Sequence, residues 1–390
     1  MDARRLDTVL LHGVDNGAVA GVVAMVATPH DVIYEGAFGR GNIDAGLPMA
    51  CDTVFWISSL TKALTATACM QLVEQGRVGL DQHVAEILPK LASPLVLEGF
   101  DEAGKPRLRP VRGFITTRHL LTHTAGFGYE IWNARLARYA ALTGLSSMGS
   151  GLNAAFEAPL ASDPGERWEY GIGIDWLGKL VEAISSQSLE IYFRENIFAP
   201  LGMTDSGFLI SSAQRQRVAT LFVRQEDGGL APAPFEMPQR PEFFMGGGGA
   251  FSTPRDYVRF LRVLLGGGAL GGARILAAET VIAMFTNQIG DLCVEKMPTA
   301  NPYYANSFDL FPGQCHKWGL SFDLNEEPGP NGRSAGSASW AGLLNCHYWI
   351  DPARKICAAM FTQTLPFFDE AVMQLYETFE RSVYGAHSNP

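Results

Sequence analysis

Charged residues are scarce in this 390-residue chain, in which Asp, Glu, Lys and Arg make up 18% of the residues against 47% for the hydrophobic ones. Basic residues are the rarer sign, 30 against 40 acidic ones, so the formal net charge is −10. No segment gathers lysines and arginines into a stripe able to neutralise a phosphate backbone, and we expect no nucleic-acid partner. A chain of this length and apolar content buries a sizeable core, which excludes disorder.

Cysteine is also rare. The six cysteines contain no Cys-x-x-Cys pair and no zinc-ligand spacing. They are also too few to form a disulfide scaffold for a chain of this length. We therefore expect reduced thiols. The longest apolar run near the start, residues 18–27, is far shorter than the roughly 20 residues that cross a bilayer. The sequence thus predicts no transmembrane helix and no membrane partner.

The same apolar run has two interpretations. With Arg4 and Arg5 upstream and Ala27 at a cleavage position, it imitates a signal peptide. Polar residues separate the arginines from the run, however, and a turn after it leads to a second β-like segment at 32–38. We favour a β-hairpin, preceded by an amphipathic helix at about 3–15, and hence a cytoplasmic, unprocessed protein.

The hydrophobic pattern and the residues that begin or end helices predict further elements. An extended run at 53–57 leads into a helix that Ser58 or Ser59 would cap and Gly76 would end. Residues 80–240 are typical of helices and long loops.

A cleaner helix start stands at Ser252 or Thr253, with Pro254 in the first turn and a glycine run at 266–268 as its end. The C-terminal part predicts strands and a final helix. We expect the strands at 318–323, 340–350 and 355–362, a turn at 351–354 and the helix at 370–380.

Strands at both ends and helices between them predict an α/β fold of the α+β type. We expect one mixed, mostly antiparallel sheet, built from both termini and flanked by helices, with a mainly helical domain inserted. The sheet domain is placed at 1–80 and 308–390 and the helical domain at 81–307, with the active site at their interface.

A serine and a lysine stand three residues apart at the expected helix start. Residues at this spacing share a helix face, so Ser59 and Lys62 would present a hydroxyl beside an amine. A lysine desolvated in a closed site loses proton affinity and accepts the serine proton, while the helix N-terminus favours the developing negative charge. No other lysine has Ser at this spacing. The alternative is a capped helix with a surface lysine.

Several segments resemble the serine β-lactamase-like superfamily of class C β-lactamases, low-molecular-weight penicillin-binding proteins and family VIII carboxylesterases. They follow the family order between about residues 5 and 380. The matching segments are Ser59-Leu-Thr-Lys62, Leu72-Val-Glu-Gln-Gly-Arg-Val-Gly-Leu-Asp81, Leu120-Leu-Thr-His-Thr-Ala-Gly126, Asp163-Pro-Gly-Glu-Arg-Trp-Glu-Tyr170 and Phe198-Ala-Pro-Leu-Gly-Met203.

The resemblance implies that Tyr170 is the second-motif tyrosine, which helps to take the proton of the nucleophile and pass it to the leaving group. A phenol titrates near 10, so it needs a neighbouring cation such as Lys62 to act near neutrality. Ser59, Lys62 and Tyr170 would then form one catalytic unit. A buried tyrosine with a bonded hydroxyl is the structural alternative for Tyr170.

Two positions depart from the lactamase pattern. Ile172 stands where the lactamases have the Asn of Tyr-x-Asn, and Trp340-Ala-Gly342 replaces Lys-Thr-Gly. An indole supplies no cation for the carboxylate of a penicillin or peptide. Trp-x-Gly is similar to the family VIII esterases, so an uncharged ester fits better than a β-lactam. By the same resemblance, Gly342 lets the strand approach the ligand, and the backbone N–H groups of Ser59 and Leu343 form the oxyanion hole.

Other motifs are weighed against this reading. Gly332-Arg-Ser-Ala-Gly336 spells the Gly-x-Ser-x-Gly elbow of α/β-hydrolases, but turn-forming residues precede Ser334 and a strand follows it, the reverse of what the elbow needs. We do not expect Ser334 to be catalytic. The four glycines 246–249 lack a following Gly-Lys-Ser/Thr, so we expect a tight turn near the site instead of a phosphate loop.

His119 and His123 would share a helix face at a metal-like spacing. Since no third ligand is near in the sequence, we favour capping or core hydrogen bonds over zinc. Phe127, Tyr129 and Trp132 are candidates for lining the acyl pocket, although such a cluster is also typical of a core.

The sequence therefore predicts a serine hydrolase without cofactor or metal, which cleaves small carboxylic esters of short to medium acyl chain through an acyl-enzyme. Ser59 attacks, Lys62 and Tyr170 move the proton, and Trp340, Gly342, Phe127, Tyr129 and Ile172 contact substrate. A class C-like β-lactamase, weak or not, or a D-amino-acid peptidase is the alternative within the same fold. A catalytically silent ligand-binding relative is the alternative from another class.

Overall fold

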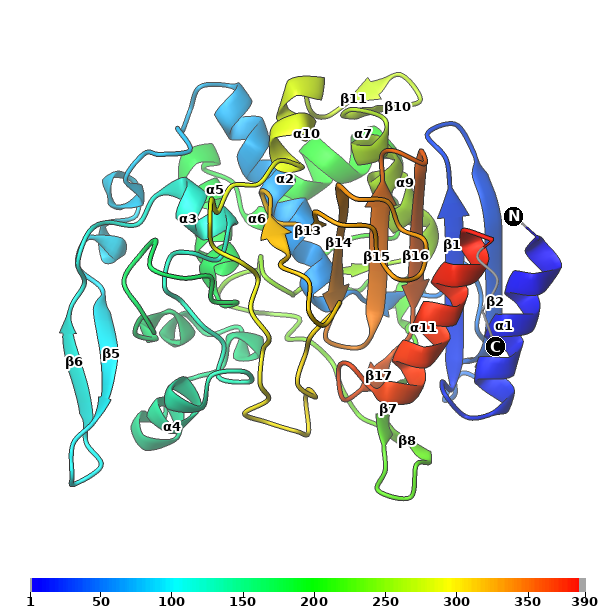
Figure 1. Ribbon diagram of the computed structural model, residues 1–390, viewed down its shortest axis with the longest axis horizontal. Coiled ribbons are helices and arrows are strands. Elements are labelled where there is room, and N and C mark those ends of the chain that lie inside the picture. Colours follow the sequence, from blue (N-terminus) through cyan, green and yellow to red (C-terminus); the bar gives the residue numbers. More distant parts are fainter. Residues whose placement is uncertain (1, 386–390) are drawn as a thin grey trace.

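One eight-stranded sheet unites both ends of the chain in the computed structural model, which describes residues 2–385. Its neighbouring strands all pair antiparallel, and the pairing of β1 with β16 joins the N-terminal strands to the C-terminal ones (Figure 1). This confirms the predicted α/β fold with a sheet from both termini. In spatial order the strands are β12 (Lys317–Trp318), β13 (Asp323–Asn325), β14 (Ser337–Gly342), β15 (Cys346–Asp351), β16 (Ile356–Phe361), β1 (Gly21–Ala27), β2 (Val32–Asn42) and β3 (Leu47–Pro48).

Helices cover both faces of this sheet, as the burial of β1 on both faces shows. All seven residues of β1 are buried. Ala24 and Val26 pack in one core with α1 (Ala3–Asp15) and α11 (Glu370–Val383), whereas Met25 packs in the main core on the opposite face. Successive side chains of a strand point to opposite faces, so a continuous apolar run is what a doubly covered strand requires.

Helix α9 (Pro254–Leu265) begins where its sequence predicts. The Thr253 side chain accepts a hydrogen bond from the Asp256 N–H, Pro254 opens the first turn and Gly266 follows the last residue. The helix packs against β1 and β16. It thus contacts the sheet although it lies within the 81–307 range assigned to the helical domain; that division of the chain stays a prediction.

The remainder of the middle region holds most of the other helices. It also contains short strands, which the prediction of helices and long loops for residues 80–240 did not include. A twisted hairpin, β5 (Leu95–Phe100) with β6 (Pro106–Pro110), projects from the side away from the sheet (Figure 1). Strands β7 (Leu221–Arg224) and β8 (Leu230–Ala233) form a second hairpin. The helices of this region are α3 (Thr117–Leu121), α4 (Ala134–Thr143), α5 (Gly173–Ser185), α6 (Leu189–Phe193), α7 (Ala199–Leu201), α8 (Ser212–Arg215) and α10 (Ala278–Met284), and α2 (Thr61–Glu74) precedes it.

Three smaller pairings complete the strands. Two of them join distant parts of the chain, and the third is local. The strands are β4 (Phe55–Trp56) paired with β9 (Phe251–Ser252), β17 (Thr364–Leu365) paired parallel with β7, and β10 (Ala269–Leu270) paired with β11 (Ala273–Arg274).

Two predicted strands are wrong in their extent. The run 318–323 is not one strand, because β12 ends at Trp318 and a turn with Ser321 at φ 78° leads into β13. The run 340–350 is two strands, β14 and β15, joined by a turn in which Asn345 has φ 57°. Both turns are built from mostly apolar residues, so hydrophobicity did not reveal them.

The expectation that all six cysteines are thiols is also wrong. Cys293 and Cys315 form a disulfide, with their Cα atoms 5.5 Å apart. A β-bridge between Val294 and His316 brings the two segments side by side. The separation of 22 residues gives no local signal for such a pair. Cys51, Cys69, Cys346 and Cys357 are thiols.

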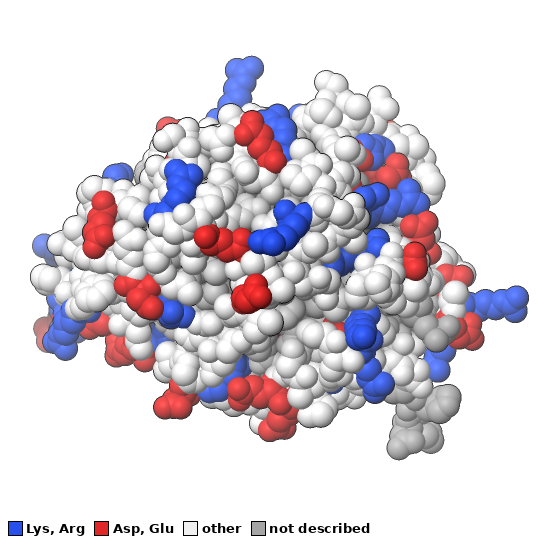
Figure 2. All heavy atoms as spheres, turned by 90° about the horizontal axis from the view of Figure 1, so that it is seen from above, with Lys and Arg blue, Asp and Glu red and all other residues white. Residues whose placement is uncertain are grey.

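Charges of both signs are interspersed on the face seen in Figure 2, between broad uncharged areas. None of the helices within residues 2–385 combines the length and apolarity that crossing a membrane requires.

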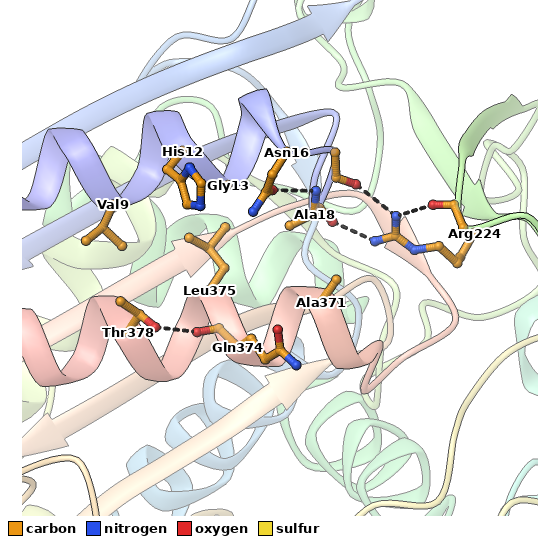
Figure 3. A pocket seen from close by; sticks show the side chains of 12 residues that line it. Val9, His12, Gly13, Asn16, Ala18, Arg224, Ala371, Gln374, Leu375 and Thr378 are labelled. Atoms are coloured by element: carbon orange, nitrogen blue, oxygen red, sulfur yellow. Dashed lines mark hydrogen bonds between the residues drawn. The ribbon is translucent and has the colours of Figure 1, made fainter. Parts of the chain in front are cut away.

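A hollow of about 390 Å³ lies between α1 and α11 (Figure 3). At its edge Arg224 donates to the carbonyl oxygens of Gly17 and Ala18 and forms an ion pair with Asp369. These contacts satisfy the guanidinium and tie the N-terminal segment to the fold.

Candidate active site

Ser59 lies at the junction between β4 and α2. A 3₁₀ turn, Ser58–Leu60, connects the two elements, and the predicted capping role of the serines is wrong: α2 begins at Thr61 and has no side-chain cap. Ser58 adopts φ 49°, a left-handed conformation that is rare outside glycine. This tight turn leaves Ser59 partly exposed at the N-terminal end of α2, where the helix favours negative charge.

Lys62 is buried directly beneath Ser59. Its Nζ lies 3.2 Å from the Ser59 Oγ, 3.2 Å from the Tyr129 hydroxyl and 2.6 Å from the Gly247 carbonyl oxygen. An ammonium has three N–H donors, so these three partners use all of them. The structure thus brings the predicted Ser59–Lys62 pair together in a closed environment, with Lys62 only 1% exposed.

Tyr129 and Asp175 extend this network. The Tyr129 hydroxyl lies 3.2 Å from the Asp175 Oδ2, and the Asp175 Oδ1 accepts the Gly247 N–H at 2.7 Å. Burial, followed by the charge of Asp175, raises the pKa of Tyr129 well above its ordinary value. Tyr129 therefore stays protonated, donates to Asp175 and accepts from Lys62. Burial also raises the pKa of the Asp175 carboxyl to about 6, against the lowering effect of Lys62.

Tyr170 contacts Lys62 through its ring. The Lys62 Nζ lies 4.7 Å from the centroid of that ring, and the Tyr170 hydroxyl lies 3.1 Å from the Trp340 Nε1. Because an indole N–H only donates, the Tyr170 oxygen accepts, and its own proton is free for another acceptor. His123 packs 4.7 Å from the Tyr170 ring, and burial with nearby Lys62 lowers its pKa well below the ordinary value.

The glycine run 246–249 forms the predicted turn beside the site. Besides the Gly247 contacts, the Gly248 carbonyl accepts the Trp56 Nε1–H at 2.6 Å. A Cβ at Gly247 would stand 2.5 Å from the Asp175 Oδ2. Only glycine therefore allows the backbone to reach both Lys62 and Asp175.

The end of β14 approaches the nucleophile segment closely. A Cβ at Gly342 would lie 2.5 Å from the Ile57 carbonyl oxygen, which explains why glycine stands there. The next residue, Leu343, points its backbone N–H at the Ser58 Oγ at 3.1 Å. The N–H of Leu343 and the Ser59 segment thus adjoin the same space, where a substrate carbonyl would displace the Ser58 hydroxyl.

A cavity of about 380 Å³ opens at Ser59. Its walls are mostly apolar and aromatic, the usual character of a small-molecule site. The lining residues are Trp56, Ser58, Ser59, Tyr129, Glu130, Ile131, Trp132, Ser147, Met148, Gly149, Ser150, Phe235, Met237, Met245, Gly248, Asn301, Tyr304 and Leu343.

Other predicted substrate contacts lie away from this cavity. Phe127 packs against Trp176, and Ile172 precedes α5 in the interior; neither lines the cavity. Trp340 is 6% exposed, and its Nε1–H donates to the Tyr170 hydroxyl. Of the predicted pocket residues, Tyr129 does line the cavity, as does Trp132 from the same predicted cluster.

The two histidines do not share a helix face. Helix α3 ends at Leu121, and His123 has φ 57° beyond it. His119 completes a capping box with Thr116, and the His123 Nδ1 accepts the Gly171 N–H at 3.3 Å. Capping and core hydrogen bonds are thus what the two side chains make.

Ser334 precedes β14 instead of a helix. Its backbone N–H donates to Asp351, and its carbonyl accepts from Asn325 and Ser337. The element that directly follows this serine is a strand, so the segment lacks the strand–turn–helix geometry of a nucleophile elbow.

Asp175 is the residue of the site that the sequence reasoning missed. It lies five residues after Tyr170 in the first turn of α5, where an acidic residue is ordinary helix chemistry. Its 1% exposure is what distinguishes it. The one available signal was an aspartate amid the apolar residues Ile174, Trp176 and Leu177.

Comparison with known proteins agrees with this geometry. A model of the Beta-lactamase family matches residues 6–380. The chain is 35% identical over 351 residues to monacolin J acid methylbutanoyltransferase of Aspergillus terreus, covering 87% of this chain and 84% of that protein. It is 29% identical over 399 residues to lovastatin esterase of Penicillium rubens, covering 98% of each. A mutant of simvastatin synthase from Aspergillus terreus superimposes with a TM-score of 0.83 at 34% identity, covering 97% of this chain and 96% of that one.

These relatives share the fold over nearly their whole length, and their names describe acyl transfer and ester cleavage. The resemblance to the serine β-lactamase-like superfamily is thereby confirmed, while the narrower likeness to family VIII carboxylesterases stays a prediction. The chain belongs to the beta-lactamase family and carries the fold of its serine hydrolases and acyltransferases.

Proposed function

We propose that this protein cleaves carboxylic esters of short to medium acyl chain through an acyl-enzyme on Ser59. The observation that carries the proposal is the contact of 3.2 Å between the Ser59 Oγ and the Nζ of buried Lys62, at the wall of an apolar cavity. A hydroxyl within hydrogen-bond reach of an amine is the arrangement of an activated nucleophile.

In the first step the Ser59 Oγ attacks the ester carbonyl carbon and its proton passes to Lys62, which must be uncharged at that moment. The carbonyl oxygen becomes an oxyanion, which the backbone N–H groups of Ser59 and Leu343 would bind once the Ser58 hydroxyl has moved aside. Collapse of the tetrahedral intermediate expels the alcohol, which takes up a proton. Water then attacks the acyl-enzyme and restores Ser59.

The tyrosines have different roles in this proposal. Tyr129, whose raised pKa disfavours the phenolate, holds Lys62 in place through its bond to Asp175. Tyr170 keeps its proton for another acceptor because the Trp340 N–H donates to its oxygen, so it is the group that gives a proton to the leaving alkoxide. The proton that Lys62 took from Ser59 then passes to Tyr170, which leaves both groups as they began. Tyr129 is a positioning residue and Tyr170 a catalytic one.

A β-lactamase would need a cation to hold the carboxylate of its substrate, and this chain has none at the corresponding position. Trp340 stands there, buried and bonded to Tyr170. Losing a hydrogen bond to a charged group costs on the order of 1.5–3 kcal/mol, or about tenfold to more than a hundredfold. We therefore expect kcat/KM for short-chain aryl esters to exceed that for nitrocefin by at least about one to two orders of magnitude. Equal efficiency on both would favour the lactamase alternative.

Acyl transfer to an alcohol is the second candidate function. It is favoured by the 35% identity to a methylbutanoyltransferase and by the apolar cavity, in which an alcohol competes with water for the acyl-enzyme. Adding a bulky apolar alcohol to the ester assay should yield the transesterified product at the expense of free acid. Release of free acid alone, at every alcohol concentration, would restrict the activity to hydrolysis.

Hydrolysis of p-nitrophenyl butyrate by matched serine variants tests the nucleophile. Ser59→Ala should lose nearly all activity while the far-UV circular dichroism stays unchanged, and Ser334→Ala should keep most of it. Mass spectrometry after a fluorophosphonate probe should find the adduct on Ser59. An adduct on Ser334 alone would overturn the proposal, and stable labelling of Ser59 without turnover would mark a silent binding relative.

A further inference from the structure

The cavity at Ser59 has an uneven charge. Of the residues that line it, Glu130 is the only one with a carboxyl group, and none is a lysine, arginine or histidine. Glu130 directly follows Tyr129 and is partly buried. Among residues 2–385, no lysine, arginine or histidine forms an ion pair with it.

The nearby cation does not balance this carboxylate. Lys62 gives its three N–H donors to Ser59, Tyr129 and Gly247, and the carboxylate of Asp175 lies in the same network. A ligand in the cavity thus meets an acid without a basic partner. Burial raises the pKa of the Glu130 carboxyl, against the lowering effect of a hydrogen bond from its own backbone N–H.

Glu130 also marks a boundary inside the site. It lines the main cavity and, with Met148, a small adjoining hollow that reaches Ile172. A group that extends from the reacting ester along this wall therefore passes Glu130.

We propose that Glu130 determines substrate class: the cavity takes esters whose extended portion ends in a cation or another hydrogen-bond donor, and it rejects esters that carry a free carboxylate there. An unpaired carboxylate in a partly desolvated cavity attracts a positive group and repels a negative one. The inference rests on the proposed ester chemistry at Ser59.

Binding of three uncleaved amides tests the inference without depending on turnover. The probes are the 4-nitroanilides of 6-(trimethylammonio)hexanoic acid, of its neutral isostere 7,7-dimethyloctanoic acid, and the mono-4-nitroanilide of adipic acid. The nitroaryl group quenches tryptophan fluorescence, and Trp56 and Trp132 line the cavity. Dissociation constants are measured at pH 8 and low ionic strength for the wild type, Glu130→Gln and Glu102→Gln. Glu102 is an exposed glutamate in the β5–β6 turn and serves as the matched control.

The cationic amide should bind the wild type and Glu102→Gln about tenfold more tightly than the carboxylate amide, with the neutral isostere between them. In Glu130→Gln the three constants should agree within about threefold. Equal binding of cation and carboxylate by the wild type, survival of the preference in Glu130→Gln, or no binding of any of the three would overturn the inference. Turnover of the neutral p-nitrophenyl ester, lost in Ser59→Ala, reports separately on the proposed function.

Discussion

Replacing Asp175 by Asn should change how the stability of the protein depends on pH. Asp175 is fully buried, and burial raises the pKa of its carboxyl from 3.8 to about 6. A carboxyl whose pKa is raised in the folded state adds stability that is complete below pH 3.8 and is lost as the pH rises through 6. Holding Asp175 ionised at neutral pH therefore costs about 3 kcal/mol of folding free energy.

The Asn variant carries no such cost. Its free energy of unfolding relative to wild type should rise with pH, by about 2 kcal/mol between pH 4.5 and pH 7.5, where most of the Asp175 titration takes place. Urea unfolding of both proteins at the two pH values measures the difference, and other titrating groups cancel because they are shared. Asp44→Asn, at an exposed position, is the control and should show no such trend.

Activity should move in the opposite direction from stability. An amide in place of the carboxylate weakens the hold on Tyr129 and Gly247, so kcat in Asp175→Asn should fall by about tenfold or more even where the variant is the more stable protein. A stability difference that stays constant from pH 4.5 to 7.5 would refute the reasoning, because it would mean that Asp175 titrates alike in the folded and unfolded chains.

Three further outcomes are expected. Lys62→Ala and Tyr170→Phe should each lower kcat by orders of magnitude, and the double variant should be little worse than either, because the two act as one unit; full additivity in steady-state kinetics would contradict this. Trp340→Phe, which removes the N–H that orients the Tyr170 hydroxyl, should reduce kcat with little change in KM, and an unchanged kcat would show that the hydroxyl needs no such partner. Gly342→Ala places a Cβ 2.5 Å from the Ile57 carbonyl oxygen. This variant should destabilise the protein by about 1–3 kcal/mol and lower kcat/KM at least about tenfold. The control Gly79→Ala, whose Cβ would lie 3.6 Å from its nearest neighbour, should do neither.

The local sequence determined a large part of the fold. The apolar run in β1, the Thr253 cap of α9 and the glycine that follows α2 each act through neighbours a few residues away, so they are readable in the chain itself. The Ser59–Lys62 pair belongs to the same class, since a spacing of three residues at a helix start places both groups on one face. The turns that divide the predicted strands at Ser321 and Asn345 were not readable, because apolar residues fill them.

The rest of the site was decided by tertiary structure. Tyr129 reaches Lys62 across 67 residues of sequence, and Asp175 reaches Tyr129 across a further 46. The disulfide partners Cys293 and Cys315 meet only because their segments pair. The resemblance to a family supplied Tyr170, but not the orientation that turns its ring toward Lys62 and its hydroxyl toward Trp340. Contacts of this kind depend on how separate elements pack, and no periodicity or spacing within one segment encodes them. Burial then sets the chemistry, because the same aspartate on an exposed helix turn would titrate as an ordinary acid.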